Sequence, residues 1–362
     1  MKYGSVKTGS PCCAGGVDVG SWSMETLTLE RFELVGALGS GADYDVRAAV
    51  DRETGRQVVL KRPLPQAVSR QMHGPVEERT TRTLDAYESA GQHCAAVPRI
   101  IGITEAALHD SYFGDEVGQQ YRVRIEERAV GIPLVGDPRS RILRVPIGLG
   151  QNLFALHPLA LPADVSPWPI QSQLLAAQEI YEAAGYALLD LGPHNIFYSP
   201  GSGQISLIDA SALVGHGVES AQANRGPQDV HEFYLEMLKF YVAPDPPPGE
   251  AAGYYDPYNQ RPVISIDQEC DDLGRAFSTA AENLREAVNL CLLKIRTKGY
   301  GTVAEFGRDL QECLAQITIL HEAMPGRDEA AVAWNSALQR LTENHWTRYL
   351  FDPDTELNGL SA

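Results

Sequence analysis

A loop followed by a hairpin signal in the middle of the chain limits the possible folds more than any other feature. Two β-type runs, residues 195–198 and 205–208, flank the sequence Ser-Pro-Gly-Ser-Gly, which is a strong hairpin signal. A helix with Leu174 and Tyr181 on one side comes before them and is expected to end at Gly185, a residue suited to a left-handed cap. The sequence therefore predicts a helix, a tight loop and a hairpin in direct succession.

Three polar side chains lie in or beside this hairpin. Asp190 and Asn195 belong to the loop, and Asp209 follows the second strand, so all three are expected near the ends of one hairpin, facing one cleft. An amide and a carboxylate supply oxygen ligands of the kind that Mg²⁺ prefers, and one carboxylate is left over as a base. Taken alone, Asp-x-x-x-x-Asn is also the pattern of a capped turn.

The loop resembles the catalytic loop of the protein-kinase-like superfamily. The family's His-Arg-Asp-Leu-Lys-Pro-x-Asn looks like Leu-Leu-Asp-Leu-Gly-Pro-His-Asn at residues 188–195, with the Asp-to-Asn spacing kept. The family's Asp-Phe-Gly looks like Asp-Ala-Ser, which begins at Asp209. The resemblance implies that Asp190 is the catalytic residue that accepts a hydroxyl proton, and that Asn195 and Asp209 hold Mg²⁺.

A glycine-bearing strand pair early in the chain is similar to the family's phosphate-binding hairpin. A lone Gly-x-Gly is a weak signal, but a β-branched strand follows it here, whereas a dinucleotide-binding fold requires a helix. The resemblance implies that Gly39 and Gly41 fold over the phosphates of ATP, that Val46 packs on the adenine and that Lys61 contacts the α- and β-phosphates. Tyr44 stands where the family has its third glycine.

The family holds the strand lysine with a glutamate from a helix. Residues 75–92 have a helical composition, and the family's spacing back from Pro98, which would open the fourth strand, points to Glu88 as this catalytic-site glutamate. Glu77 and Glu78 are expected instead to be solvated charges near the start of the helix, where the helix dipole favours them.

Three further matches follow in the family's order. The alternating segment 121–131 resembles the last small-lobe strand and the hinge, whose backbone groups at residues 126–128 would pair with adenine. Asp229 opens an apolar helix similar to the buried central helix of the large lobe, where it would brace the catalytic loop. Thr302 begins a capping-box pattern, Thr-x-x-Glu, before a helix with leucines on one face.

Charge and hydropathy narrow the expected partners. A net charge of −17 argues against general nucleic-acid binding and against an anionic membrane surface, although it does not exclude ATP. No stretch approaches the roughly 20 apolar residues of a membrane span, and the first residues lack the apolar region of a signal peptide, so a cytoplasmic protein is expected. The six cysteines show no metal-ligand spacing.

These matches predict an α+β, bilobal protein-kinase-like fold. A small lobe with an antiparallel β-sheet and one helix is expected above a larger, mainly helical lobe. The expected boundaries are a disordered leader at 1–24, the small lobe at 25–131, the large lobe at 132–320 and a C-terminal helical extension at 321–362.

The resemblance implies an ATP- and Mg²⁺-dependent phosphotransferase, of the divergent bacterial serine/threonine protein kinase type, acting on an unknown hydroxyl-bearing acceptor. Within the motifs, Leu188-Leu189 replaces His-Arg, Gly192 replaces the catalytic-loop lysine and Ala210-Ser211 replaces Phe-Gly. A small-molecule kinase similar to aminoglycoside or choline phosphotransferases, which also lack this lysine, is one alternative. A pseudokinase acting as a binding module is another, although the lysine, both aspartates and the asparagine argue against it.

Overall fold

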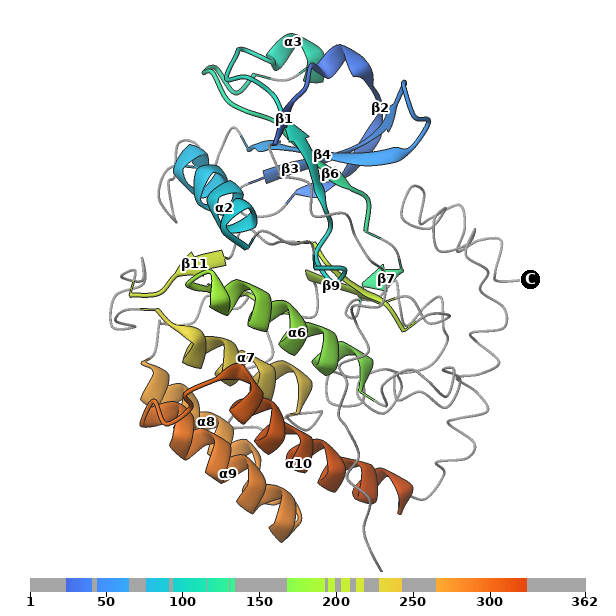
Figure 1. Ribbon diagram of the computed structural model, residues 1–362. Helices are drawn as coiled ribbons and strands as arrows, with labels where there is room; N and C mark the ends of the chain where they lie inside the picture. Colours follow the sequence, from blue (N-terminus) through green and yellow to red (C-terminus); the bar gives the residue numbers. More distant parts are fainter. Residues whose placement is uncertain are drawn as a thin grey trace, which may run out of the picture.

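The computed structural model describes twelve stretches of the 362-residue chain: 24–40, 44–64, 76–90, 94–114, 116–129, 131–133, 168–192, 195–198, 203–208, 213–217, 228–242 and 265–323. These residues form an α+β fold with a six-stranded mixed sheet and, among the described residues, seven α-helices. Figure 1 shows the sheet with α2 and α3 at one end of the molecule and the helices α6 to α10 at the other.

The sheet is almost wholly antiparallel. Its strands are β1 (Glu25–Thr26), β2 (Phe32–Ser40), β3 (Tyr44–Asp51), β4 (Gln57–Pro63), β5 (Ile100–Ile103) and β6 (Arg124–Glu127). Their order is β1-β5-β6-β4-β3-β2, and the short β1 alone runs parallel to its neighbour, β5. The antiparallel pairing of β2 with β3 is what the sequence predicts for a glycine-bearing hairpin, and it differs from the strand–helix order of a dinucleotide-binding fold.

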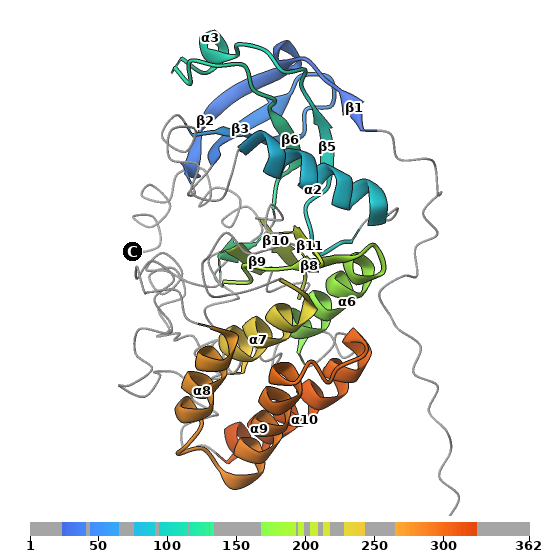
Figure 2. The same ribbon diagram turned by 90° about the vertical axis from the view of Figure 1, so that its left-hand side faces the viewer.

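One helix covers a face of this sheet. Helix α2 (Val76–Ala90) crosses in front of strands β5 and β6 in Figure 2 and confirms the helix expected at residues 75–92. Thr80, Thr83 and Leu84 are buried on the side of the helix that faces the sheet, and Ala86 is buried in the core formed with the other helices. The 3₁₀ helix η2 (Leu29–Arg31) and the single turn α3 (Asp110–Phe113) complete the sheet-containing part.

The second part consists of helices and very short strands. The helices are α6 (Pro169–Ala183), α7 (Val230–Tyr241), α8 (Ile266–Ala276), α9 (Glu282–Arg296) and α10 (Val303–Glu322). The strands are β7 (Ile132–Pro133), β8 (Tyr186–Leu188), β9 (Ile196–Tyr198), β10 (Ile205–Leu207) and β11 (Leu213–Gly215), which form the sheets β10-β9-β7 and β11-β8.

The helix, loop and hairpin predicted around Asp190 are confirmed. Helix α6 ends before Gly185, which has a left-handed φ of 84° and donates its N–H to the carbonyl of Glu182. Strands β9 and β10 pair in antiparallel register, with Ile205 opposite Tyr198. The pairing of β8 with β11 was not predicted; it brings the chain just beyond the Asp209 segment back beside the start of the loop.

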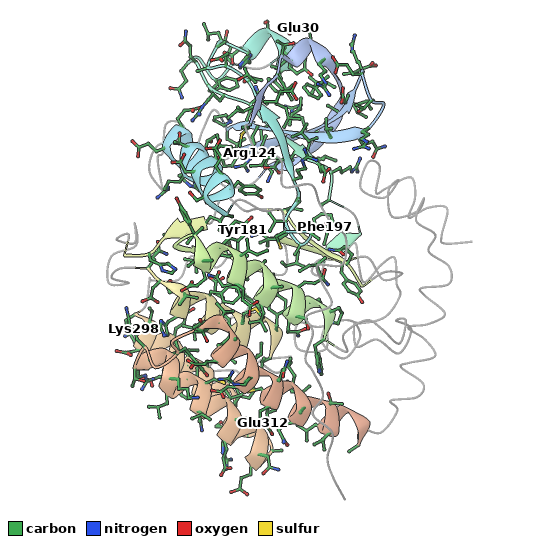
Figure 3. The ribbon with its side chains drawn as sticks, viewed as in Figure 1. Glu30, Arg124, Tyr181, Phe197, Lys298 and Glu312 are labelled. Atoms are coloured by element: carbon green, nitrogen blue, oxygen red, sulfur yellow. The ribbon has the colours of Figure 1, made fainter. Side chains whose placement is uncertain are left out.

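The two largest hydrophobic cores among the described residues hold the fold together. One lies within the sheet-containing part and includes Phe32, Leu60 and Ile125. The larger one joins the helices, with Phe233 and Leu310 fully buried, and it extends to residues of α2 and to the segment at 94–97. Tyr87 of α2 and Tyr181 of α6 place their ring centroids 6.0 Å apart, so the two parts also meet through an aromatic contact; Figure 3 labels Tyr181.

The capping box expected before α10 forms with a small change. Thr302 Oγ1 accepts the N–H of Glu305 at 3.2 Å, while the Glu305 carboxylate accepts the N–H of Gly301 at 2.8 Å. Most of the expected leader and most of the expected C-terminal extension lie outside the described residues. No helix in the described stretches is long and apolar enough to cross a membrane.

Candidate active site

The loop that carries Asp190 leads from strand β8 into strand β9. Asp190 is exposed and has a φ of 60°, a left-handed conformation that side-chain-bearing residues rarely adopt. Its carbonyl oxygen accepts a hydrogen bond from Asn195 Nδ2 at 2.9 Å. The next peptide N–H, that of Leu191, donates to Glu236 Oε2 of α7 at 2.7 Å. The peptide group that follows Asp190 is thus held at both its C=O and its N–H.

Asn195 lies at the point where the loop meets the hairpin. Its side chain is buried, its N–H donates to Gly192 O, and its carbonyl accepts the N–H of Ile208 at 2.8 Å. The Asn195 side-chain Nδ2 donates to the backbone carbonyl of Asp190. The other polar atom of this side chain is Oδ1, to which no described residue donates a hydrogen bond. An amide oxygen in this state can serve as a ligand for a hard cation.

Lys61 reaches the same place from the sheet-containing part. Its ammonium group donates to the carbonyl of Ile208, the residue directly before Asp209. It also forms an ion pair with Glu126 of β6, with Nζ 3.1 Å from Oε2. The side chains of Lys61 and Glu126 are almost fully buried, so solvent screens this pair little.

The predicted nucleotide-binding residues of the strands form one row across the sheet. Gly39 of β2 is opposite Val46 of β3, Val46 is opposite Lys61 of β4, and Lys61 is opposite Arg124 of β6. Residues in register across a sheet direct their side chains to the same face. The structure therefore brings Val46 and Lys61 together beside Gly39, as predicted, whereas Gly41 lies outside the described residues.

The expectation that Glu88 holds Lys61 is wrong. Glu88 is exposed, and it forms no ion pair or hydrogen bond within the described stretches, whereas Glu126 holds the lysine from the neighbouring strand. The reason is the rotation of α2, which turns Thr80, Thr83 and Leu84 toward the sheet. Glu88 falls outside this buried stripe, and spacing from Pro98 does not determine the rotation of a helix.

Two other acidic residues also differ from expectation. Glu77 is not simply a solvated charge, because its carboxylate accepts the backbone N–H and the Nε–H of Arg122 at 2.9 and 2.8 Å, which ties α2 to the chain just before β6. Glu126, expected only within a hinge recognised through its backbone, uses its side chain to pair with Lys61 and with Arg124. Figure 3 labels Arg124 in the sheet beside α2.

Asp229 caps helix α7 but does not brace the loop through any described residue. It accepts the N–H of His231 at 2.8 Å and pairs with Lys298 at 2.5 Å. Although burial opposes ionisation, the bonds from His231 and Lys298 hold the pKa of the Asp229 carboxyl below its usual range. The bracing expected of Asp229 comes from two residues further along the same helix, Glu236 and Tyr241.

Two side chains of helix α7 bind the two polar backbone groups of Leu191. Glu236 accepts the Leu191 N–H, and the Tyr241 hydroxyl donates to the Leu191 carbonyl at 2.5 Å. Neither residue belongs to a motif in the sequence; only their positions at i and i+5 on an apolar helix point to a polar contact there. On the other side of the loop, Gln178 of α6 accepts the N–H of Leu188 at 2.7 Å.

Glu236 also shapes the electrostatics around Asp190. Burial, and next the negative charge of Asp190, raise the pKa of Glu236 from 4.5 to about 8. The Leu191 N–H and the ammonium group of Lys239 act in the opposite direction. The raised pKa favours a protonated Glu236 carboxyl group near neutral pH.

The apolar departures within the loop have a structural explanation. Leu188 and Leu189, which differ from the His-Arg of the pattern that the loop resembles, are buried in the core that joins the helices. They anchor the loop by burial of apolar surface, and they leave Gln178, Glu236 and Tyr241 to bind its backbone. Asp209 and Ala210-Ser211 lie outside the described residues, so the neighbouring Ile208 marks where the chain enters that segment.

No protein-family model matches this chain, and a search of curated proteins finds no match. The site is therefore characterised by its own geometry: Lys61 and Asn195 meet at Ile208, and Asn195 meets the peptide of Asp190.

Proposed function

We propose that this chain is an ATP-dependent phosphotransferase of the protein-kinase-like type, with a bilobal fold, that transfers the γ-phosphoryl group to a hydroxyl. The observation that supports it most is the contact of Lys61 with the Ile208 carbonyl, which joins residues 147 positions apart. Ile208 also donates its N–H to Asn195. A buried lysine, an asparagine and an aspartate are thereby gathered where the resemblance expects a phosphate-binding group, a metal ligand and a base.

Among the described residues, Gly39, Lys61 and Asn195 are of types suited to a nucleotide and its metal ion. Lys61 would contact the α- and β-phosphates, and Gly39 and Gly41 would lie over them. Asn195 would hold Mg²⁺ through Oδ1, which no described residue occupies, together with Asp209. Magnesium bound with a nucleotide takes few protein ligands and keeps phosphate oxygens and water as the others, so two side chains are sufficient. When bound, Mg²⁺ neutralises charge on the phosphates.

Asp190 is the residue placed to act on the acceptor. In the proposed reaction the acceptor oxygen forms a bond to the γ-phosphorus, the bond from that phosphorus to the β,γ-bridging oxygen breaks, and ADP leaves. Asp190 takes the hydroxyl proton. Its exposed carboxylate can be reached by an acceptor, while Asn195 and Glu236 fix the peptide group that sets its direction.

One catalytic donor of the family is missing from the loop. Gly192 stands where the family has a lysine, and loss of one charge-stabilising donor costs about 3–4 kcal/mol of transition-state stabilisation when nothing replaces it. We therefore expect slow turnover, well below the 1–100 s⁻¹ typical of kinases.

A radiolabelled ATP assay tests the proposal. The wild-type protein is incubated with γ-labelled ATP and Mg²⁺ against generic protein substrates, small alcohols and buffer alone. Transfer to protein hydroxyls would support a serine/threonine kinase, and transfer to a small alcohol would support a small-molecule kinase. The variants Asn195→Ala and Lys61→Met should abolish the signal, and Glu179→Ala, an exposed position on α6, should leave it unchanged. Binding of ATP without any transfer or hydrolysis would favour a pseudokinase.

A further inference from the structure

The peptide group between Asp190 and Leu191 is held from outside the loop by one carboxyl group. Glu236 Oε2 lies 2.7 Å from Leu191 N, and Asn195 Nδ2 lies 2.9 Å from Asp190 O. These two bonds fix the plane of the peptide, and the plane determines where the Asp190 side chain leaves the backbone. Asn195 belongs to the same loop, whereas Glu236 comes from the centre of helix α7.

We propose that Glu236 is a positioning residue for the phosphotransfer reaction, which holds the Asp190 carboxylate in the direction needed to meet the acceptor hydroxyl. The inference rests on the proposed function, because it gives Asp190 the role of the base. Glu236 itself does not need to touch ATP or the acceptor.

The left-handed backbone conformation of Asp190 explains why the loop needs stabilising hydrogen bonds at this point. With φ at 60°, Asp190 occupies a region that costs energy for a residue with a Cβ atom, and such conformations persist only where surrounding contacts impose them. The contacts here are Asn195 on the carbonyl of Asp190, Glu236 on the N–H of Leu191 and Tyr241 on the carbonyl of Leu191. Among the described residues, Glu236 is the only acceptor for the Leu191 N–H. Removal of the Glu236 side chain therefore leaves this N–H without its hydrogen bond.

The surroundings of Glu236 explain why an acid can serve here without repelling Asp190. Glu236 faces Asp190 of the loop, Glu269 of α8, and Lys239 and Tyr241 of its own helix. Lys239 is held by Glu269 at 2.7 Å, so its charge is already balanced. Burial therefore favours a protonated Glu236, whose carbonyl oxygen still accepts the Leu191 N–H. A glutamine, which is neutral and keeps such an oxygen, should replace it.

The test compares Glu236→Gln with Glu236→Ala in the full-length chain, using transfer to the acceptor found in the screen or, with no acceptor, ATP hydrolysis. We expect Glu236→Ala to lower kcat at least about tenfold with the KM for ATP changed less than about twofold, because misplacing a catalytic group affects the reacting geometry. Glu236→Gln should restore kcat to within about threefold of wild type. Equal activities of the alanine variant and wild type would overturn the proposal, as would a glutamine variant no better than alanine.

A control separates positioning from loss of stability. Val288→Ala removes buried volume in α9, away from the loop, and should lower the melting temperature without changing kcat. The two alanine variants are compared at equal loss of melting temperature. If Val288→Ala then lowers kcat as much as Glu236→Ala does, the effect is structural and the proposal fails.

Amide hydrogen exchange of the peptide spanning residues 189–192 supplies a readout that does not need activity. The Leu191 amide should be protected in wild type and in Glu236→Gln, and it should exchange faster in Glu236→Ala. An unchanged exchange rate in Glu236→Ala would show that Glu236 does not protect the Leu191 amide, and would overturn the proposal. If the wild type neither transfers phosphate nor hydrolyses ATP, the proposed function fails. The positioning role then also fails, even if hydrogen exchange shows that Glu236 binds the loop.

Discussion

Lys61 Nζ donates to the carbonyl oxygen of Ile208, so a buried strand lysine is fixed to the residue immediately before Asp209. The same lysine pairs with Glu126 on the adjacent strand. Lys61 thus joins the sheet-containing part to the end of the β9–β10 hairpin, and the Ile208 N–H continues the connection to Asn195. A change at Lys61 should therefore affect both nucleotide binding and the contact between the two parts.

The first prediction concerns nucleotide binding by Lys61. Ligand binding to the native state raises stability by about 2.7 kcal/mol at a concentration 100-fold above Kd, which is measured as a rise in melting temperature. Millimolar Mg²⁺–ATP should produce this rise in wild type, and Lys61→Met should reduce or abolish it. Arg56→Met, which removes an exposed charge in the turn before β4, is the control and should respond like wild type. A full shift in Lys61→Met would show that the lysine does not contact the phosphates.

The second prediction separates the two candidate partners of Lys61. Removing one member of a buried ion pair leaves an uncompensated charge and costs about 3–5 kcal/mol, so Glu126→Ala should be strongly destabilising. Glu88→Ala should change the free energy of unfolding by less than about 0.5 kcal/mol, because Glu88 is exposed. Denaturant unfolding of the three proteins measures both values. A larger loss from Glu88→Ala than from Glu126→Ala would contradict the pairing.

The third prediction is a pH dependence that arises from Glu236. Its pKa is 4.5 in the unfolded chain and is raised to about 8 by burial and by Asp190 in the folded protein. Between these values the folded state binds more protons than the unfolded state, so this group makes stability fall as pH rises. Glutamine does not titrate. The stability of Glu236→Gln relative to wild type should therefore be lowest near pH 4.5 and increase up to about pH 8.

Urea unfolding at pH 5, 6.5 and 8 measures this difference. Asp190→Asn is an informative partner variant, because loss of the neighbouring charge should make the pH dependence weaker. A difference between Glu236→Gln and wild type that stays constant over this range would show that the pKa of Glu236 is not raised.

The fourth prediction concerns the cap of α7. Asp229→Ala should cost about 1 kcal/mol of stability through loss of the bond to the His231 N–H, and Asp229→Asn, which keeps a capping oxygen, should cost less. The low pKa of Asp229 adds stability that is present above the ordinary value of 3.8 and is lost as pH falls. Wild type and Asp229→Asn should therefore converge in acid. Thermal unfolding at pH 7 and pH 3 tests this, and an asparagine variant equal to alanine at pH 7 would contradict the capping role.

The sequence predicted the elements around the site because their signals are local. Hairpin residues at 199–203, the left-handed Gly185 and the strand following Gly39 each act on nearby backbone, and the structure confirms the hairpin, the end of α6 and the β2–β3–β4 meander. The leucines expected on one face of the helix after Thr302 are confirmed in the same way, because Leu310 and Leu314 of α10 are buried.

The partners of the site residues could not be predicted in this way. Whether Glu88 or Glu126 reaches Lys61 depends on the rotation of α2 against the sheet, which is set by packing of Thr80 and Leu84. Likewise, the choice of Glu236 over Asp229 to hold the loop depends on how far along α7 the loop crosses. Both are tertiary distances between segments that are remote in sequence.

The rate of phosphoryl transfer by Asp190→Asn, measured at saturating Mg²⁺–ATP beside the affinity for ATP, tests the central claim most directly. If Asp190 is the base, transfer should fall about a hundredfold or more while ATP affinity stays nearly unchanged, because the residue acts mainly in the transition state. The loop should remain folded, since its bonds to Asn195 and Glu236 use backbone atoms of Asp190 and Leu191. Unchanged transfer by the folded variant would contradict the account and remove Asp190 from the mechanism.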